Sequence, residues 1–429
     1  MAADYFPLAP SLWAATATPA PATHALDADA QADVVVVGAG FCGLSAALRL
    51  AERGVRVTVL EAREIGFGAS GRNGGQVIPG LKFDPAELIS MFGAEKGGRL
   101  VDFAAGTADA VFDLIDRHGM DVPRARQGWI QAAHTPEALR LAERRVADWR
   151  SHGVDARLLD RGEAARLLGT DRYFGGWIDP RAGGIQPLSY ARELARVAIA
   201  AGAAVHTASP ATDMRRDGGR WQVRTAGGAT VVADHVLLCT NGYTGDLWPG
   251  LRRTIIDANS FQIATEPLPA DLRRTILPEG QVCSDARRLL LYYRLDHQGR
   301  LLMGGRGTFS EPRDPSDWAQ LEGVVARLFP QAARVPIAYR WCGHLAVTRD
   351  YLPHVHEPAP GLTIDIGCQG RGVGLQTRMG RALADRVVDD DIAALPVAPS
   401  PIKPFPLHGL RRFYIAAVLG WYRLLDGAL

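Results

Sequence analysis

One stretch near the N-terminus constrains the fold more than any other: residues 33–61, DVVVVGAGFCGLSAALRLAERGVRVTVLE. Its pattern is that of a buried strand, a glycine turn, a helix closed by Gly54 and a second strand ending at Glu61. Strand, helix and strand joined by short connections form a βαβ unit with parallel strands. The sequence therefore predicts an α/β fold.

The turn in this unit has the spacing G-x-G-x-x-G, at Gly38, Gly40 and Gly43. In a dinucleotide-binding turn the first glycine permits the tight bend, the second lets the backbone approach a pyrophosphate, and the third lets helix and strand pack closely. Glu61 could accept hydrogen bonds from ribose hydroxyls, and an acid there would repel the 2′-phosphate of NADP. We therefore predict a site for FAD or NAD.

A second glycine-rich turn between a strand and a helix, GCQGRGVG, occupies residues 367–374. An extended ligand in contact with both turns would meet one helix N-terminus at its pyrophosphate and another at its far end. FAD fits this description better than NAD, because a helix N-terminus at the flavin pyrimidine would stabilise the negative charge of the reduced ring. The alternative is a helix-entry turn without a ligand.

The stretch GFGASGRNGGQ, residues 66–76, has five glycines around Ser70, Arg72 and Asn73, and no acid. Such a stretch folds tightly only against a partner that accepts hydrogen bonds from exposed backbone. A phosphate-bearing or flat aromatic ligand would serve, and an acid there would be repelled by the phosphates. The alternative is an ordinary flexible loop.

With 429 residues, the chain exceeds the size at which one core usually stops growing, so we expect two domains. Residues 1–31, rich in Ala, Pro and Thr, predict an extended arm. Strand-like residues 259–264, 287–295 and 300–305, the last two joined as a hairpin by DHQG, predict an antiparallel sheet. We expect this sheet in a substrate domain of residues 81–182 and 251–349, beside a Rossmann-like FAD-binding domain assembled from residues 32–80, 183–250 and 350–429.

Within the second of those FAD-domain segments, PLSYARELARVAIAAGAAVH predicts a helix capped by Ser189, followed by a strand. Charged residues make up 22% of the chain, with a formal charge of +2, as in ordinary globular proteins. The basic residues are nearly all scattered arginines, so we expect no nucleic-acid partner.

The five cysteines are dispersed and lack C-x-x-C spacing, which argues against a disulfide framework and against a metal site. The first 48 residues contain no Lys or Arg, so neither a secretory signal nor a twin-arginine signal is expected, and we predict a cytoplasmic protein. The apolar run at 413–422 is too short to span a bilayer. It predicts an amphipathic helix packed on the body, with association at a membrane surface as the alternative.

Several motifs resemble one family: EAREIGFGASGRNGGQ, LLLYYRLDHQGRLLMGG, YRWCGHLAVTRDYLPHV, GCQGRGVG and PFPLHGLRRFYIAAVLGWYRLLD. They are similar to the FAD-dependent amine oxidoreductases of the D-amino-acid oxidase superfamily, whose fold is related to that of glutathione reductase, and within it to the γ-glutamylputrescine oxidase group. The likeness covers nearly the whole chain. It implies a flavoenzyme without a membrane span that oxidises the C–N bond of a small amine to an imine, which water hydrolyses to an aldehyde. O2 or another acceptor would then take the electrons.

The resemblance also implies which residues hold FAD. At the nucleotide turn and the following strand these are Gly38, Gly40, Phe41, Cys42, Gly43, Glu61, Ala62 and Arg63. In the loop beside the flavin they are Gly68, Ala69, Ser70, Arg72, Asn73, Gly74, Gly75 and Gln76. Further along they are Ala211, Thr240, Asn241, Gly242, Gly370, Arg371, Gly372, Val373 and Gly374.

Three departures from the family pattern matter. Many relatives have Ser-Gly-His-Gly where this chain has Gln369-Gly370-Arg371-Gly372. The related sarcosine oxidases attach flavin through a Cys upstream of T-x-D, and alignment on Thr348 and Asp350 puts Gly343 there with Cys342 one residue away, so we predict non-covalent FAD. Those relatives also activate oxygen with a Lys on the strand corresponding to RLLMGG, which has none, so oxidase and dehydrogenase both remain open.

Flavin oxidation of an amine needs a positioned neutral amine and a dry site, but no protein nucleophile. The candidates for positioning the substrate are Tyr293, Arg294, Arg306, Trp341, His344 and Arg371. Tyr292 and Tyr293 would point to opposite faces of a strand, so at most one of them faces the site. An arginine could bind a substrate carboxylate bidentately. The alternative to a substrate role is that His344 is a structural histidine and that Arg294 and Arg306 form ion pairs at the surface.

We expect hydride transfer to flavin N5 with O2 reduced to H2O2. A dehydrogenase that passes electrons to a quinone, a biosynthetic oxidase of a larger amine, and a flavin-binding protein without turnover are the alternatives, because fold and cofactor do not fix the substrate.

Overall fold

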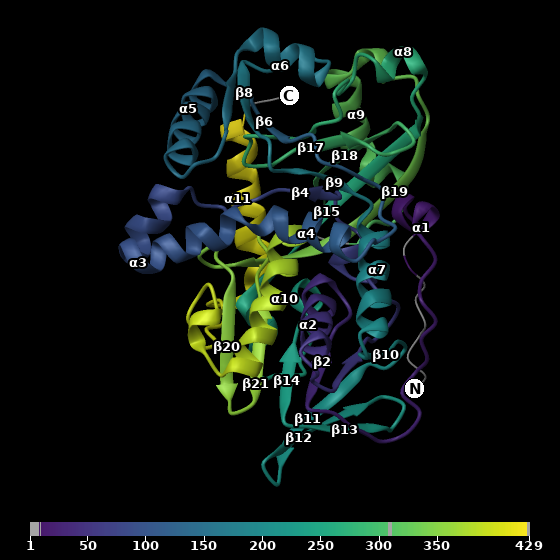
Figure 1. Ribbon diagram of the computed structural model, residues 1–429. Helices are drawn as coiled ribbons and strands as arrows, with labels where there is room; N and C mark the ends of the chain where they lie inside the picture. The colour runs from purple at the N-terminus through teal and green to yellow at the C-terminus, as the bar shows by residue number, and fades with distance from the viewer. Residues whose placement is uncertain (1–7, 9, 308–310, 427–429) are drawn as a thin grey trace.

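The computed structural model describes residue 8, residues 10–307 and residues 311–426. Two large sheets dominate it, one near each end of the molecule (Figure 1). The sheet at the lower end in Figure 1 is the nucleotide sheet, and the other is called the large sheet below.

The nucleotide sheet has six strands and is parallel except for its last pair. Its order is β10 (Ala204–His206), β3 (Val57–Leu60), β2 (Val34–Val37), β14 (His235–Leu238), β21 (Leu362–Ile366) and β20 (His354–Ala359). All four valines of β2 are buried, as expected of a strand covered on both faces. Strands from distant parts of the chain thus lie side by side, which confirms the predicted discontinuous Rossmann-like fold.

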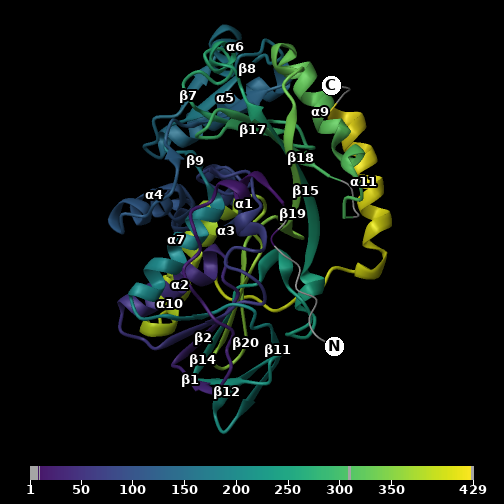
Figure 2. The same ribbon diagram turned by 90° about the vertical axis from the view of Figure 1, so that its right-hand side faces the viewer.

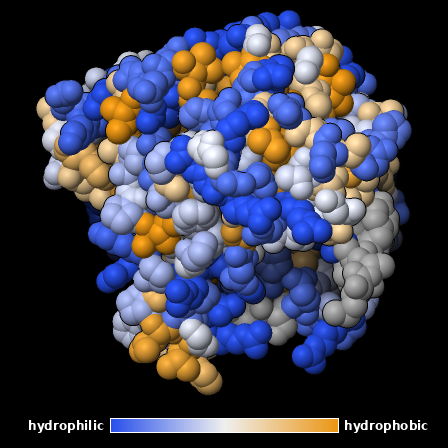
Figure 3. Space-filling view, turned by 90° about the horizontal axis from the view of Figure 1, so that it is seen from below, coloured by the Kyte–Doolittle hydropathy of each residue, from blue (hydrophilic) through white to orange (hydrophobic). Residues whose placement is uncertain are grey.

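Three helices pack into one core against this sheet. They are α2 (Phe41–Glu52), α7 (Pro187–Ala200) and α10 (Gly372–Asp389). A four-stranded sheet contributes to the hydrophobic core on the other face. Its order is β1 (Ala30–Gln31), β13 (Thr230–Ala233), β12 (Arg220–Thr225) and β11 (Ala211–Asp217). The surface at this end of the molecule is mostly hydrophilic, with separate hydrophobic groups (Figure 3).

The large sheet has eight strands and is antiparallel except where β16 pairs with β6. Its order is β19 (Ile337–Thr348), β15 (Ile255–Pro267), β18 (Arg300–Arg306), β17 (Tyr292–Leu295), β16 (Val282–Asp285), β6 (Trp129–Ala133), β8 (Gly175–Asp179) and β7 (Arg157–Leu159). The predicted hairpin is confirmed as β17 and β18. The helices α5 (Pro136–Ser151), α6 (Arg161–Leu168) and α9 (Ala319–Leu328) pack against this half.

The remaining helices and strands connect the two halves. The strands β4 (Gln76–Val77), β9 (Gly183–Ile185) and β5 (Arg124–Ala125) form a small sheet. The helices α3 (Pro85–Ala105) and α4 (Thr107–Arg117) contribute Leu100 and Val111 to the core that α2 and α10 share. The domain boundaries given above stay a prediction, although this packing joins the start of the segment 81–182 to the nucleotide half.

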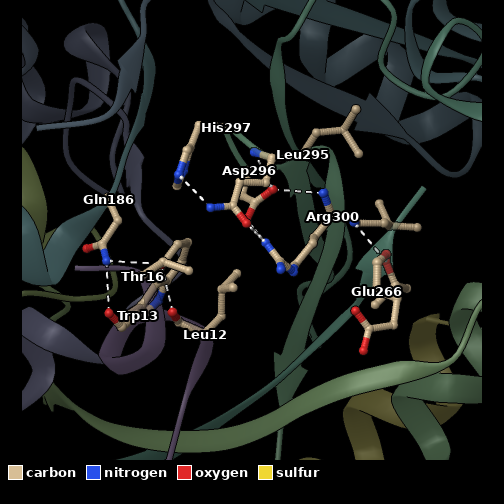
Figure 4. A network of polar contacts seen from close by, with 12 residues as sticks. Leu12, Trp13, Thr16, Gln186, Glu266, Leu295, Asp296, His297 and Arg300 are labelled. Atoms are coloured by element: carbon tan, nitrogen blue, oxygen red, sulfur yellow. Dashed lines mark hydrogen bonds and ion pairs between the residues drawn. The ribbon is translucent and has the colours of Figure 1, made fainter. Parts of the chain in front are cut away.

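The N-terminal arm is anchored, and it is not extended throughout. Its helix α1 (Leu12–Thr16) is capped by Ser11, whose Oγ accepts from Ala14 N at 3.1 Å. Trp13 is buried, and its carbonyl accepts a 2.9 Å hydrogen bond from Gln186 Nε2, which also reaches Thr16 (Figure 4). Residues 10–31 of the arm are therefore part of the folded body.

The same glutamine corrects the predicted cap of α7. The helix begins at Pro187, and its cap is Gln186, whose side-chain oxygen accepts from Ser189 N at 2.8 Å. Proline suits the first helical position, and the cap lies three residues before the predicted one. The hydroxyl of Ser189 accepts from Thr18 N at 3.0 Å and so binds the arm.

The C-terminal helix α11 (Arg411–Asp426) runs along one edge of the molecule (Figure 2). Arg411 lies 3.6 Å from Asp257 of β15, and Phe413 and Trp421 are exposed. Among the helices that the structure describes, none is long and apolar enough to cross a bilayer.

Candidate functional site

A cavity of about 990 Å³ connects the nucleotide turn with the large sheet. Its lining comes from the first βαβ unit, the loop 66–76, the end of β14, the start of α10 and strands β15, β17, β18 and β19. A volume of this size is at the upper end of the range for small-molecule sites. The cavity therefore joins the two glycine-rich turns that the sequence analysis singled out.

At the nucleotide end, the backbone is packed too closely for side chains. A Cβ on Gly43 would lie 2.0 Å from the carbonyl oxygen of Gly38, and one on Gly40 would lie 2.8 Å from Ser70 Oγ. The cap of α2, Gly40, has no side chain, and the first turn of the helix lines the cavity, with Phe41 N donating to Ser70 Oγ at 3.0 Å. This arrangement suits a pyrophosphate, because a helix N-terminus attracts anions.

Glu61 ends β3 beside this turn. Its carboxylate accepts from Ala39 N at 2.8 Å and from Arg63 N at 2.9 Å, and it lines the cavity. Burial raises the pKa of Glu61, while these hydrogen bonds oppose the rise. A carboxylate so oriented has lone pairs left for ribose hydroxyls.

The loop 66–76 is held partly by its own polar side chains. Asn73 Nδ2 donates to the carbonyls of Ala69 at 3.0 Å and Ser70 at 2.9 Å, and its Oδ1 accepts from Gly75 N at 2.8 Å. Arg72 Nε donates to Phe67 O at 2.8 Å. Both side chains also line the cavity. The side chains of Arg72 and Asn73 therefore hold the loop in shape through hydrogen bonds within it. The sequence had not predicted this role.

Buried donors hold the same loop from behind. Arg294 Nη1 donates to Gly75 O at 2.5 Å, and Trp13 Nε1 donates to Asn73 O at 2.7 Å. The carbonyl of Arg72 accepts from Trp341 Nε1 at 3.0 Å and also from the side-chain amide of Gln262. The loop's carbonyls thus point into the protein, away from any ligand.

The second glycine-rich turn completes the cofactor end. Gly370 has φ +80°. Gly370 lines the cavity together with Gly372 and Val373 at the start of α10. Gly367 N donates to Asn241 Oδ1 at 3.1 Å, which ties this turn to the end of β14. A helix N-terminus with its partial positive charge therefore faces the far end of the cavity.

Most of the predicted cofactor residues line the cavity. They are Gly38, Gly40, Phe41, Cys42, Glu61, Ala62, Arg63, Gly68, Ala69, Ser70, Arg72, Asn73, Gly74, Gln76, Ala211, Thr240, Asn241, Gly242, Gly370, Gly372 and Val373. Gly43, Gly75 and Gly374 instead allow backbone to pack closely, since a Cβ on Gly374 would lie 2.7 Å from Thr107 O. Direct contact of each residue with FAD stays a prediction.

At the end near the large sheet, side chains form the lining. The Tyr292 hydroxyl lies 2.7 Å from Ser260 Oγ, and its ring covers Gly304, where a Cβ would come within 2.1 Å of the ring. Arg306 lies at the end of β18, where burial lowers the pKa of its guanidinium. His344 Nε2 lies 2.6 Å from Glu311 Oε1. Polar groups of this kind can orient a small substrate.

Two aromatic side chains in this lining were missed in the sequence. Tyr351 follows the T-x-D segment, and Tyr422 projects from α11; both line the cavity and lie near Arg306. The quoted C-terminal motif was a signal for Tyr422, but sequence alone could not show that α11 folds back onto the site. Lys82, just before α3, lines the cavity as well, and it lies in none of the motifs quoted from the sequence.

Four of the predicted substrate-positioning residues do not line the cavity. Tyr293 is fully buried in the core behind the sheet, where its ring centroid lies 5.3 Å from that of Phe329. Adjacent residues of a strand face opposite sides, so Tyr292 takes the cavity side. Trp341 and Arg294 are buried and hold the loop 66–76 from behind.

Arg371, predicted for both a cofactor role and a substrate role, is the fourth residue that does not line the cavity. Its Nη1 donates to Pro79 O at 2.6 Å, and its guanidinium carbon lies 5.2 Å from the centroid of the Trp129 ring. Burial, with Arg145 nearby, lowers its pKa to about 10. The glycine turn brings the backbone of Arg371 beside the cavity, but its side chain leaves on the other side.

These features together fit FAD: a helix N-terminus whose cap is a glycine, the acid Glu61, the glycine-rich loop 66–76 and a second helix N-terminus line one cavity. The fold and the site thus define a dinucleotide-binding oxidoreductase. Residues 33–386 match the family model described as "FAD dependent oxidoreductase" (DAO), so the chain belongs to this family and its cofactor is FAD.

Two curated relatives match nearly the whole chain. The gamma-glutamylputrescine oxidoreductase of Escherichia coli (strain K12) is 34% identical over 422 residues, covering 97% of this chain and 98% of that protein. The probable oxidoreductase OrdL of Rhizobium meliloti (strain 1021) is 32% identical over 437 residues, covering 98% of each.

Solved structures share the fold. The glycine oxidase from Geobacillus kaustophilus gives a TM-score of 0.72 at 23% identity and covers 83% of this chain and 94% of its own. The L-proline dehydrogenase from P. horikoshii gives a TM-score of 0.70 at 19% identity and covers 84% and 94%. These likenesses show the fold, whereas the class of enzyme, an FAD-dependent oxidoreductase, follows from the family match.

Proposed function

We propose that the protein oxidises the C–N bond of a small amine that bears a carboxylate, of the γ-glutamylputrescine type. The products would be an aldehyde, formed by hydrolysis of the imine, and H2O2, with O2 as the electron acceptor. The name of the E. coli relative supports the substrate type. The main structural support is the charge of the cavity.

Cations exceed acids in the cavity lining. Arg306, Arg288 and Lys82 line it on the side of the large sheet and of α3. Among the described lining residues the acids are Glu61, which belongs to the nucleotide end, and Asp246, which lies beyond β14 near Arg252. An unmodified diamine would need a carboxylate partner, whereas a substrate carboxylate would find a guanidinium, so the γ-glutamyl type is favoured.

The chain's own side chains would orient the substrate and keep water out. Arg306 would bind the carboxylate, and the ring of Tyr292, fixed through Ser260, would cover one side of the amine. Tyr351 and Tyr422 would close the cavity on the side of α11. When bound, FAD supplies the two-electron acceptor. The side chain of Cys342, the cysteine nearest the T-x-D alignment, approaches Glu311 at 3.5 Å and does not line the cavity, which supports non-covalent FAD.

An anaerobic absorbance titration of the purified holoenzyme tests this function. We expect γ-glutamylputrescine to bleach the flavin bands, with a weaker response to sarcosine and D-alanine. Admitting air then identifies the acceptor, since rapid return of the bands with H2O2 release indicates an oxidase. Bands that return only with a quinone or dye would indicate a dehydrogenase, and flavin that stays oxidised with every amine would contradict the proposal.

We also propose a cytoplasmic location. All five cysteines are free and buried, which suits a reducing compartment. Fractionation of the native host, with the enzyme assayed in each fraction, tests this.

A further inference from the structure

We propose that Lys82 accepts a proton from the substrate's ammonium group, so that the substrate reacts as the neutral amine. This inference rests on the proposed function and adds a residue to it. The C–H bond of an amine breaks as a hydride, and the nitrogen lone pair forms the C=N bond. An ammonium group has no lone pair, so its proton must first pass to a base: R–CH2–NH3⁺ and the neutral lysine give R–CH2–NH2 and the lysine ammonium. The two electrons then go to the bound FAD.

The position of Lys82 supports the role. It lies between β4 and α3. Protein surrounds it closely enough to disfavour its charged form, yet its side chain keeps accessible surface and lines the cavity together with Gln76 and Ile78 of the same segment. Among the residues that the structure describes, its ammonium group makes no hydrogen bond or ion pair. An amine that faces a ligand cavity without a protein partner is available to the ligand.

The groups that act on the charge of Lys82 are two arginines and a thiol. Arg371 is held on Pro79 O, and Arg145 donates at 2.8 Å to Asp84, the nearby acid, which leaves no free carboxylate for the lysine. The Cys368 thiol is the other neighbour, and its own pKa is raised by burial. Burial first, and then Arg371 and Arg145, lower the pKa of Lys82 to about 8. A lysine with such a pKa is partly neutral near pH 8, and its nitrogen lone pair can then accept a proton as a general base.

The other titratable groups in the lining are less suited. Burial raises the pKa of the Tyr292 phenol, so it stays protonated. His344 is already bound to Glu311 through Nε2, and its Nδ1 is buried with no partner among the described residues. Arg306 is a permanent cation. Compared with these three groups, Lys82 has both access to the cavity and, when neutral, an available lone pair.

The competing role for Lys82 is that of a fixed positive charge for the substrate carboxylate. Arginine keeps such a charge but cannot act as a base. The variants Lys82→Met and Lys82→Arg thus separate the two roles. Lys96→Met, at an exposed position on α3, is the matched control.

The sequence makes a direct measurement possible, because its lysines are only Lys82, Lys96 and Lys403. Reductive methylation of the holoenzyme with ¹³C-formaldehyde labels all three, and the signal missing in Lys82→Met identifies Lys82. We expect this signal to titrate near pH 8, well below an ordinary lysine at about 10.4. A Lys82 signal that titrates near pH 10 would overturn the proposal.

The kinetic test follows flavin reduction by the active amine, anaerobically and against pH. We expect the wild-type rate to rise with pH through a limb near 8, and that limb to be lost in both Lys82 variants. Their rates at pH 8 should fall by roughly two decades, as for a missing general base. Full FAD content and an unchanged melting temperature exclude misfolding, and Lys96→Met should behave as wild type.

Recovery of the rate by Lys82→Arg would show a fixed charge and contradict the proposed base. The two proposals fail differently. A panel of amines that leaves the flavin oxidised contradicts the proposed function, whereas an ordinary pKa for Lys82 contradicts its role as a base whatever the substrate is.

Discussion

The two ends of the cavity present different kinds of surface to a ligand. At the nucleotide end the ligand would meet backbone, and Gly40 and Gly43 are there because a Cβ would collide with neighbouring atoms. At the end near the large sheet it would meet the side chains of Tyr292, Arg306 and His344. Close backbone packing requires glycines at fixed spacing, which can be recognised in the sequence. The direction of a side chain depends on strand pairing and packing, which cannot be read from the sequence.

The change expected to have the largest effect is Gly43→Ala, at the nucleotide end. Its Cβ would lie 2.0 Å from Gly38 O, and backbone on both sides leaves little room to relax. We expect loss of bound FAD and a destabilisation on the order of 4 kcal/mol. The flavin-to-protein absorbance ratio and thermal unfolding measure this. Gly98→Ala, in α3 with open space around it, is the control, and equal FAD loss in both would contradict the packing argument.

Arg306→Met tests the other end. If this guanidinium binds the substrate carboxylate, KM should rise by roughly two decades, on the order of 3 kcal/mol, with FAD content unchanged. Steady-state kinetics with carboxylated and carboxylate-free amines measures the effect. Arg313→Met, at an exposed position, should leave KM as it is. An unaltered KM in Arg306→Met would remove this arginine from the substrate site.

Trp341→Phe sharpens the comparison, because the Trp341 side chain contacts the loop 66–76 without lining the cavity. The variant keeps an aromatic ring but loses the donor that lies 3.0 Å from Arg72 O. We expect a stability loss of about 1 kcal/mol and a shifted flavin spectrum. Trp421→Phe, on the exposed side of α11, should change neither. If the spectrum stays the same in Trp341→Phe, the loop does not depend on this donor.

The smallest expected effect concerns Asp350, in the turn after β19. Burial opposes ionisation, but a 2.9 Å contact with His354 and further hydrogen bonds lower its pKa to about 2. The folded pKa lies below the unfolded one, so the stabilisation is present above about pH 4 and is lost as the pH falls toward 2. Because the side chain is partly exposed, we expect less than about 1 kcal/mol. Asp350→Asn should flatten urea-unfolding stability across that window, and an equal acid loss in both proteins would count against this pair.

The paired tyrosines show why the substrate end was harder to predict. The sequence indicates that Tyr292 and Tyr293 lie on opposite faces, but which face meets the cavity depends on the packing of Phe329 behind the sheet. Arg371 illustrates a second difficulty. The prediction that Arg371 lies in a glycine-rich turn was correct. Its guanidinium, however, donates to the carbonyl of Pro79, almost 300 residues earlier in the chain. Long-range contacts of this kind are absent from local patterns.

The nucleotide end was predicted well for the complementary reason. The βαβ unit and the two glycine turns are local patterns whose geometry the residues themselves impose. Even there, the donors that hold the loop 66–76, such as Trp13 and Gln262, come from elsewhere and carry no local signal.

The order of strands in the nucleotide sheet has a consequence for biosynthesis. Helix α2 packs against α10. The apolar face of α2, near residue 50, is therefore covered only after the chain near residue 380 has been made. At roughly 5–20 residues per second, a ribosome needs about 15 to 65 s to make the intervening chain. During that interval the face of α2 that meets α10 stays uncovered and the flavin site lacks its second glycine-rich turn. A nascent chain of this kind should depend on chaperones, and it should acquire its cofactor only after release.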